Sequence, residues 1–177
     1  MLAIVYYGGL QAVKLINGYH RITNAIKIFE YNLLFGKHFI HEKFSFRDGF
    51  HILVEKDGLL EIGNGCFFNN GCSITCMNHI IIGDNTIFGE DVKLYDHNYH
   101  INQSTIIKNS GHTLGEIKVG SNCWIGSNVV LLKGADIGDN SVIGASCIIA
   151  SRIEEGSIVT VKGNYDVSKR IIKSSDM

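Results

Sequence analysis

One spacing dominates the middle of this chain: an apolar residue recurs at every sixth position. The longest run consists of Val119, Ile125, Leu131, Ile137, Ile143 and Ile149. The same spacing occurs upstream at Ile62, Phe68 and Ile74 and, after a shift of two residues, at Ile82, Phe88 and Leu94. A helix would place apolar residues three or four apart and a half-buried strand would place them two apart, so neither explains this period. The chain must therefore fold from six-residue units.

A period of six is typical of a hexapeptide-repeat β-helix, in which each unit is one short strand and one turn. Three units form a triangular coil, and successive coils stack about 4.8 Å apart with one apolar side chain per face pointing inward. The corners require residues that tolerate a left-handed backbone, which Gly, Asn and Asp do best. The sequence places such residues at Gly63-Asn64-Gly65, Gly83-Asp84-Asn85, Ser121-Asn122, Ser127-Asn128 and Gly138-Asp139-Asn140. We therefore predict an all-β fold, a parallel β-helix.

The first 37 residues lack this period. Their apolar residues recur at the spacing of an amphipathic helix, at Leu15, Ile22, Ile26, Phe29 and Leu33. We predict a short N-terminal helical cap over residues 1–37, because solenoids need capping elements. A helix that lies on a membrane surface is the less favoured interpretation. The β-helix is expected over residues 38–163, beginning near Ile40, Phe46 and Ile52, with a C-terminal tail at residues 164–177.

Composition narrows the classes of function. The net charge is -1, which gives no indication of nucleic-acid binding. The five cysteines all fall within the repeat region, and we interpret them as buried small residues in a reducing compartment rather than as disulfides or metal ligands. The apolar start of the chain is too short for a membrane span and lacks the features of a signal peptide. We therefore expect a cytoplasmic protein without a metal site.

The period is lost between Leu94 and Val119. This interval contains the segment DHNYH at residues 96–100 and then a polar stretch. A long insertion in a compact solenoid is usually functional. We predict a protruding loop over residues 97–116 that carries the chemistry of the protein.

Two stretches carry a resemblance to a known family. The segment CWIGSNVVLLKGADIGDNSVIGAS, residues 123–146, resembles the hexapeptide acyltransferases of the galactoside and maltose acetyltransferase group. The segments FSFRDGFHILVEKDG, FFNNGCSI and VKLYDHNYH are more similar to bacterial capsule and O-antigen O-acetyltransferases. The resemblance implies a left-handed coil, acetyl-CoA as the acetyl donor, a carbohydrate acceptor, and a homotrimer that holds the donor between subunits.

In this family the histidine that opens the protruding loop is the catalytic base, and His97 matches it. The chemistry needs such a group, since a sugar hydroxyl must lose its proton as it attacks the thioester. A neutral imidazole is well suited to accept that proton near neutral pH. The group that orients the imidazole stays open at this point: Asp96, a backbone carbonyl or an acid from elsewhere in the chain would each serve.

The resemblance also predicts binding residues. For the acceptor these are Asn69, which is equally well explained as a corner residue, together with Asp96 and His100. His100 and His112 lie in the same loop and either could contact the acceptor, but an exposed loop histidine is the default interpretation of both. For acetyl-CoA, the matching positions are Trp124, which also fits a contact between subunits, Ser127 and Ala145. Arg152 and Lys162 are candidates for the CoA phosphates by charge alone.

The sequence thus favours an acetyl-CoA-dependent O-acetyltransferase that acts on a hydroxyl of a bacterial surface polysaccharide or its precursor. Two alternatives remain. A sugar-nucleotide N-acetyltransferase would use the same fold and donor. A non-catalytic β-helix scaffold would not need a histidine-bearing loop where the repeat is interrupted.

Overall fold

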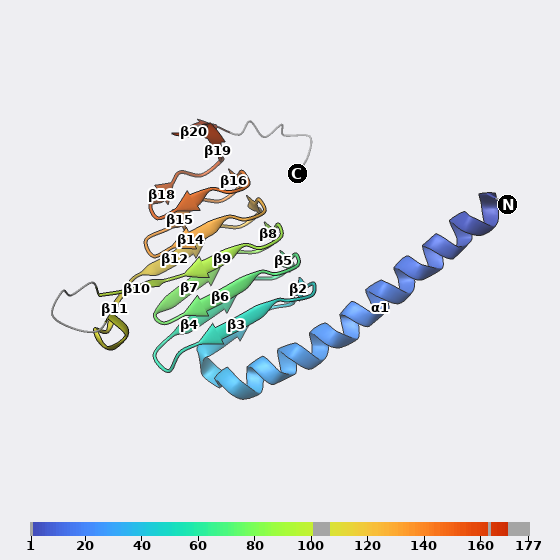
Figure 1. Ribbon diagram of the computed structural model, residues 1–177, viewed down its shortest axis with the longest axis horizontal. Helices are drawn as coiled ribbons and strands as arrows, with labels where there is room; N and C mark the ends of the chain where they lie inside the picture. Colours follow the sequence, from blue (N-terminus) through green and yellow to red (C-terminus); the bar gives the residue numbers. More distant parts are fainter. Residues whose placement is uncertain (1, 101–106, 163, 170–177) are drawn as a thin grey trace. The chain divides into compact units, whose positions relative to one another are not determined.

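The structure is a computed structural model. It describes the backbone of residues 2–100, 107–162 and 164–169, and the side chains of residues 15–16, 18–100, 107 and 109–161. The chain divides into two units, residues 1–36 and residues 37–177 (Figure 1). The first unit is a single helix, α1 (Leu2–Phe35), followed at the junction by the short helix η1 (Gly36–His38). The N-terminal helix is present, and its role as a cap stays a prediction.

The second unit is a parallel β-helix of three sheets, which we name A, B and C. Sheet A contains β1 (Phe39–His41), β4 (Leu59–Ile62), β7 (His79–Ile82), β12 (Glu116–Val119), β15 (Asp136–Ile137) and β18 (Arg152–Ile153). Sheet B contains β2 (Ser45–Phe46), β5 (Phe67–Phe68), β8 (Ile87–Phe88), β13 (Trp124–Ile125), β16 (Val142–Ile143), β19 (Ser157–Lys162) and β20 (Asn164–Lys169). Sheet C contains β3 (His51–Val54), β6 (Ser73–Cys76), β9 (Lys93–Tyr95), β14 (Val130–Leu132) and β17 (Ile148–Ile149). Apart from β20, each strand of these sheets pairs in parallel with its equivalent in a neighbouring coil, so the predicted left-handed β-helix of hexapeptide repeats is confirmed.

The six-residue period marks the core. Within sheet A, Ile62 pairs with Ile82, and Val119 pairs with both Ile82 and Ile137. All of the periodic residues predicted from Ile62 to Ile149 are buried. In the first coils the core is aromatic: Phe50 packs at a tilt against Phe68 at 4.8 Å between ring centroids, and Phe68 stacks on Phe88 at 4.4 Å. Stacked rings of this kind add attraction beyond the buried area itself.

The expected start of the repeat is wrong by one position. Ile40 is exposed, and Phe39 is buried in its place. The cause is a short first corner. His41 pairs with Ile62, and Phe46 pairs with Phe68. The step from His41 to Phe46 is therefore five residues, whereas the equivalent step from Ile62 to Phe68 in the next coil is six. Phe46 and Ile52 are buried as expected.

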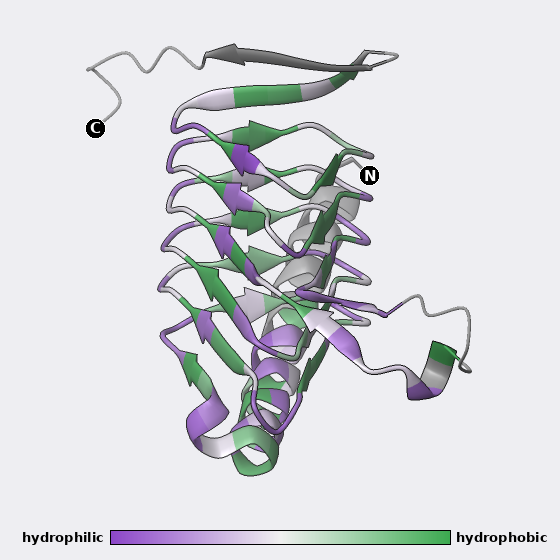
Figure 2. Ribbon diagram, turned by 90° about the vertical axis from the view of Figure 1, so that its left-hand side faces the viewer, coloured by the Kyte–Doolittle hydropathy of each residue, from purple (hydrophilic) through white to green (hydrophobic). Residues whose placement is uncertain are grey.

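The corners form columns of left-handed residues. Five such residues stack along the edge between sheets A and B, namely Gly65, Asn85, Asn122, Asn140 and Gly156. Five more stack along the edge between sheets B and C, namely Gly49, Gly71, Asp91, Asn128 and Ser146. Figure 2 shows the stacked coils with hydrophilic residues gathered along their turns. The predicted corner residues therefore lie at corners.

Two segments depart from the coils. A two-stranded antiparallel hairpin, β10 (His97–Tyr99) with β11 (His112–Leu114), follows β9 and precedes β12, and it projects from the stack (Figures 1 and 2). The short helix η2 (Ile107–Asn109) belongs to the segment that connects the two strands. At the other end of the unit, β20 pairs antiparallel with β19, so the start of the predicted tail forms a strand. Residues 101–106 of the predicted loop and 170–177 of the tail lie outside the described residues.

Candidate functional site

The hairpin leaves the β-helix at the edge between sheets C and A. Asp96 connects β9 to β10, and Gly115 connects β11 to β12. The Gly115 N–H donates to the Asp96 carbonyl at 2.8 Å, which closes the base of the hairpin. The Asn78 side-chain amide donates to the Gly115 carbonyl, also at 2.8 Å. Both ends of the inserted segment are thus fixed to the coil below.

The Asp96 carboxylate is the buried centre of this junction. It is 0% exposed and accepts hydrogen bonds from the backbone N–H groups of Met77 at 2.9 Å and Asn78 at 2.7 Å. A buried carboxylate needs such donors, because its desolvation is otherwise costly. The two donors belong to the corner between β6 and β7, so the β-helix itself holds the carboxylate in place.

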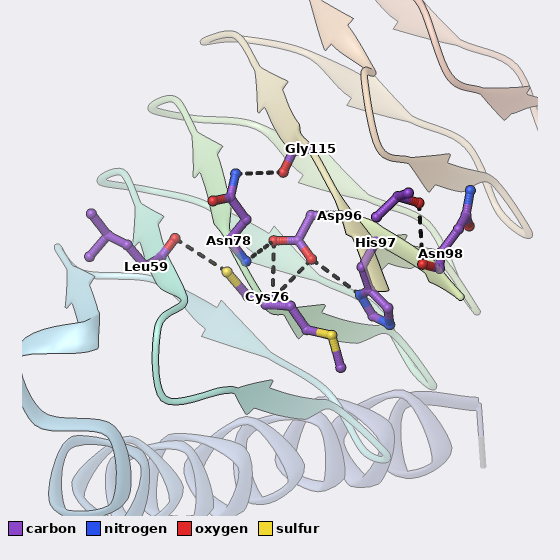
Figure 3. Close-up of polar contacts among 9 residues, drawn as sticks. Leu59, Cys76, Asn78, Asp96, His97, Asn98 and Gly115 are labelled. Atoms are coloured by element: carbon purple, nitrogen blue, oxygen red, sulfur yellow. Dashed lines mark hydrogen bonds and ion pairs between the residues drawn. The ribbon is translucent and has the colours of Figure 1, made fainter. Parts of the chain in front are cut away.

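The His97 imidazole turns toward this carboxylate. Its Nδ1 lies 3.2 Å from Asp96 Oδ1, and the side chain is 13% exposed (Figure 3). A carboxylate can only accept, so Nδ1 carries the hydrogen and the neutral ring keeps a lone pair on Nε2. Adjacent residues face opposite ways only within a strand, and Asp96 lies between two strands. The open question of what orients His97 is therefore answered by its own neighbour.

A buried thiol lies beneath the carboxylate. Cys76 is 0% exposed, and its Sγ donates to the Leu59 carbonyl at 3.3 Å (Figure 3). Burial and the adjacent Asp96 carboxylate raise the pKa of the Cys76 thiol to about 12. All five cysteines are buried, as the sequence predicts for small core residues.

Two further aromatic side chains of the hairpin, His112 and Tyr99, pack next to the His97 ring. The His97 ring meets the His112 ring edge to face at 5.5 Å between centroids, and His112 packs against Tyr99 at 4.5 Å. The default interpretation of His112 as an exposed loop residue is wrong, because its Nε2 is buried. The cause is strand pairing, which places His112 opposite Tyr99. His100 is exposed, and its backbone N–H donates to Gly111.

Other predicted site residues lie along the edge between sheets B and C. Asn69 directly follows β5, and its Oδ1 accepts from the Asn70 N–H at 2.9 Å. Ser127 and the exposed Ala145 occupy equivalent positions in successive coils, since Ile125 pairs with Ile143. The coils are tight here: a Cβ added to Gly126 would come within 2.6 Å of the Ala145 nitrogen. Asn69, Ser127 and Ala145 therefore share an edge of the β-helix.

The remaining predicted donor-binding residues are more dispersed. Trp124 is 54% exposed on the outer face of sheet B. Arg152 lies in sheet A, where it forms ion pairs with Asp136 at 3.7 Å and Glu154 at 3.1 Å. The side chain of Lys162 lies outside the described residues. Within the part of the chain that the structure describes, no group of His, Cys, Asp and Glu is arranged to hold a metal ion.

Four of the predicted residues thus fall on two edges. His97 lies at the edge between sheets C and A, and Asn69, Ser127 and Ala145 lie at the edge between sheets B and C. All of sheet C separates the two sets within one chain. Sequence reasoning missed the anchoring donors Met77 and Asn78, which no local motif distinguishes from other corner residues.

Comparison with known proteins supports the hexapeptide-repeat class of fold. Residues 116–151 match the family model for the bacterial transferase hexapeptide (six repeats). The galactoside O-acetyltransferase of Escherichia coli (strain K12) is 35% identical over 94 residues, which are 53% of this chain and 46% of that protein. The E. coli protein named "Putative lipopolysaccharide biosynthesis O-acetyl transferase WbbJ" is 26% identical over 110 residues, 58% of this chain and 56% of that protein.

Solved structures agree on the fold. The hexapeptide-repeat acetyltransferase VCA0836 of Vibrio cholerae, crystallised with acetyl-CoA, superposes with a TM-score of 0.69 at 21% identity, over 84% of this chain and 78% of that one. The predicted resemblance to hexapeptide-repeat acyltransferases is confirmed. The chain spans about half the length of the curated relatives that it matches. No helix among the described residues is both long and apolar enough to cross a membrane.

Proposed function

We propose that this protein is an acetyl-CoA-dependent O-acetyltransferase with His97 as its general base. The observation that carries the proposal is the contact between Asp96 and His97 at the point where the hexapeptide repeat is interrupted. The contact leaves Nε2 of the neutral ring as the free basic atom. The names of the relatives and of the solved neighbours, which are acetyltransferases, support the same reaction class.

The reaction follows from this geometry. Nε2 of His97 removes the proton from an acceptor hydroxyl as the oxygen attacks the thioester carbonyl of acetyl-CoA. The new C–O bond forms, the C–S bond breaks, and the imidazolium returns its proton to the departing CoA thiolate. Asp96 stabilises the transient imidazolium and fixes the ring. Since the Asp96 carboxylate is fully buried, we assign it a positioning role in place of the predicted contact with the acceptor.

The acceptor that we propose is a sugar hydroxyl of a bacterial surface polysaccharide or its precursor. The names of the two E. coli relatives, one for galactosides and one for lipopolysaccharide biosynthesis, support a carbohydrate. His100 and Asn69 stay predictions as acceptor contacts. The reducing cytoplasm, where acetyl-CoA is available, suits the five buried cysteine thiols.

We further propose that the donor binds between subunits of a homotrimer. A site that uses both His97 and the row formed by Asn69, Ser127 and Ala145 needs two copies of the chain, because these residues lie on different edges. The row fits an extended pantetheine arm, since Ala145 is small and exposed and Ser127 supplies a hydroxyl. Trp124 would lie beside this row, and Arg152 and Lys162 would serve the phosphates by charge.

The test is transfer of acetyl from acetyl-CoA to a panel of bacterial sugars, measured by the release of the free CoA thiol. His97→Ala should lower kcat by about 10²–10⁴-fold, because proton removal loses its base. The activity of the wild-type protein should also fall at acid pH, since imidazolium cannot accept a proton. His51→Ala, which removes an exposed imidazole from β3, is the matched control and should leave kcat unchanged. Near-normal turnover by His97→Ala would remove His97 from this role.

A further inference from the structure

The N-terminal helix α1 carries a row of six apolar residues, which we name the α1 stripe. The residues follow one another in alternating steps of four and three, namely Leu15, Tyr19, Ile22, Ile26, Phe29 and Leu33. All six are exposed in the single chain, from 55% at Ile26 to 77% at Leu33. The helix is unbroken over this length (Figure 1), and the chain contains no proline that would bend it.

The spacing of the α1 stripe is that of a coiled coil. Alternating steps of four and three average 3.5 residues per turn, and this repeat keeps an apolar seam facing one partner helix. A straight α-helix has 3.6 residues per turn, so a strict repeat of seven is the spacing expected when two helices wind around each other. Five consecutive steps of the α1 stripe follow this rule without an exception. The spacing therefore indicates that the partner of this face is another helix.

The area of the α1 stripe is sufficient for such a contact. A large apolar residue presents about 200 Å² when fully exposed, so six residues that keep about two thirds of it expose roughly 800 Å². Each partner of a standard protein interface contributes about 800 Å², and exposed apolar patches of this size usually mark interaction sites. A hollow of about 520 Å³ also lies along one edge of the stripe, from Gly18 to Ile26. A side chain of a neighbouring helix can enter it, as knobs enter holes in coiled coils.

The charges of α1 favour a protein partner over a lipid surface. The helix contains three basic residues, Lys14, Arg21 and Lys27, against one acidic residue, Glu30. Segments that bind anionic membranes by charge carry clusters of about 4–8 basic residues. The three basic residues of α1 are instead six or seven positions apart. So small an excess of positive charge neither attracts an anionic surface strongly nor prevents association with an identical helix.

We propose that the α1 stripe packs against the same stripe of α1 in a second copy of this chain. Among the described residues α1 is the only α-helix, since η1 and η2 have three residues each, so the partner helix comes from another molecule. A second copy supplies an identical apolar seam at the same concentration, and contacts between identical surfaces form closed symmetric assemblies. This interface belongs to the first unit of the chain and does not depend on the proposed reaction.

Disulfide formation between introduced cysteines tests the contact directly. The five native cysteines are buried, so a cysteine placed on the stripe is the accessible thiol. Under oxidation with copper phenanthroline, the Ile26→Cys protein, alone or mixed with the Ile22→Cys protein, should form a covalent dimer on a denaturing gel. Parallel helices place residue 26 opposite its own copy, whereas antiparallel helices place it opposite residue 22, because the stripe is centred between them. Arg21→Cys, an exposed position about a third of a turn from the stripe, is the control and should give about tenfold less dimer, since a disulfide needs close Cβ atoms.

Two adjacent leucines provide matched substitutions. Leu33 belongs to the stripe and Leu34 does not, although the two residues are 77% and 71% exposed. When added to the Ile26→Cys protein, Leu33→Asp should lower the yield of covalent dimer about tenfold, because the contact would bury a carboxylate without a partner. Leu34→Asp should leave the yield unchanged. Circular dichroism and thermal unfolding check that each variant keeps its helix and its β-helix.

Three outcomes would overturn the inference. A dimer yield at residue 26, alone and in the mixture, no higher than at residue 21 would mean that α1 of a second copy does not cover the stripe. Equal effects of Leu33→Asp and Leu34→Asp would mean that the contact does not use the stripe. Flotation with phosphatidylglycerol vesicles that is lost in Leu33→Asp would assign the stripe to a membrane surface instead. A protein that cross-links as expected but transfers no acetyl group would refute the proposed function and support this inference.

Discussion

At the residue scale, the candidate site depends on one carboxylate with its partners fixed on both sides. Asp96 accepts two backbone N–H groups from the preceding coil and faces Nδ1 of His97. Backbone donors in a β-helix corner cannot move independently of the coil. The imidazole therefore receives its orientation from a coil of the β-helix, although it lies in an inserted segment.

Asp96→Asn tests this arrangement. An amide has one acceptor oxygen, so it cannot satisfy Met77, Asn78 and His97 together. We expect kcat to fall by about 10²-fold or more, because the ring loses its orientation, with the KM for acetyl-CoA unchanged. Asp139→Asn is the matched control, since Asp139 also accepts a backbone N–H across coils, from Ser121 at 2.7 Å, but lies at an exposed corner. Equal kinetics in the two variants would contradict a positioning role for Asp96.

The raised pKa of Cys76 predicts a dependence of stability on pH. The unfolded thiol ionises above about pH 9, whereas the folded thiol keeps its proton until about pH 12. The contribution of this thiol to stability is therefore complete below pH 9 and is lost as pH rises toward 12. The free energy of unfolding should fall by about 1.4 kcal/mol per pH unit more steeply in the wild-type protein than in Cys76→Ala. Denaturant titrations between pH 9 and 11 measure the two slopes, and parallel slopes would refute the assignment.

At the element scale, the strands contribute inward side chains to columns that run through the coils, one from short strands such as β15 and two from longer strands such as β4 and β7. Ile137 is 1% exposed and pairs with Val119 on one side and Ile153 on the other. Because every column crosses all the coils, a defect in one strand affects its neighbours. Stability in such a solenoid is set by contacts between adjacent repeats.

Substitutions of Ile137 test the register of these columns. Ile137→Ala should lower the free energy of unfolding by about 2–5 kcal/mol, because it leaves a cavity in a packed core. Ile137→Asp should be more damaging, since the buried carboxylate would have no partner. Ile148→Ala in β17 makes the same change at a side chain that is 53% exposed and should cost little. A folded Ile137→Asp protein with unchanged stability would show that the register is wrong.

At the scale of the whole molecule, the separation of the predicted residues onto two edges is the main observation. No turn of a single β-helix brings these edges together, because sheet C lies between them. A threefold ring of copies would place one edge of each chain against another edge of its neighbour. We therefore expect light scattering to give about three times the chain mass of 19.6 kDa. A monomer under native conditions would contradict a site shared between subunits.

Ala145→Trp tests the position of the donor. The indole should obstruct the row formed by Asn69, Ser127 and Ala145 and weaken the binding of CoA, measured by calorimetry, while the mass of the assembly stays the same. Ala25→Trp makes the same substitution on an exposed position of α1, outside the β-helix, and serves as the control. Unchanged CoA affinity in Ala145→Trp would place the donor elsewhere.

The sequence by itself determined the fold, because each coil repeats one local rule. Inward positions such as Ile125 and Ile143 and left-handed corners such as Asn122 and Asn140 are set within six residues of chain. The same six-residue period therefore predicts the strands and corners of each later coil. The position of the chemistry is also visible in the sequence, since His97 stands where the period stops.

Only the tertiary structure decided what surrounds His97. The anchoring of Asp96 depends on the corner at Met77 and Asn78, and a pocket next to this corner is lined by both the turn at residues 55–57 and strand β11. These segments are far apart in sequence and share no period, so their contacts follow from the stacking of coils and the pairing of the hairpin. The displaced start at Phe39 has the same origin, because a corner shortened by one residue shows only when strands pair. A local repeat fixes local geometry, and contacts between unlike segments are fixed only by the packing that brings them together.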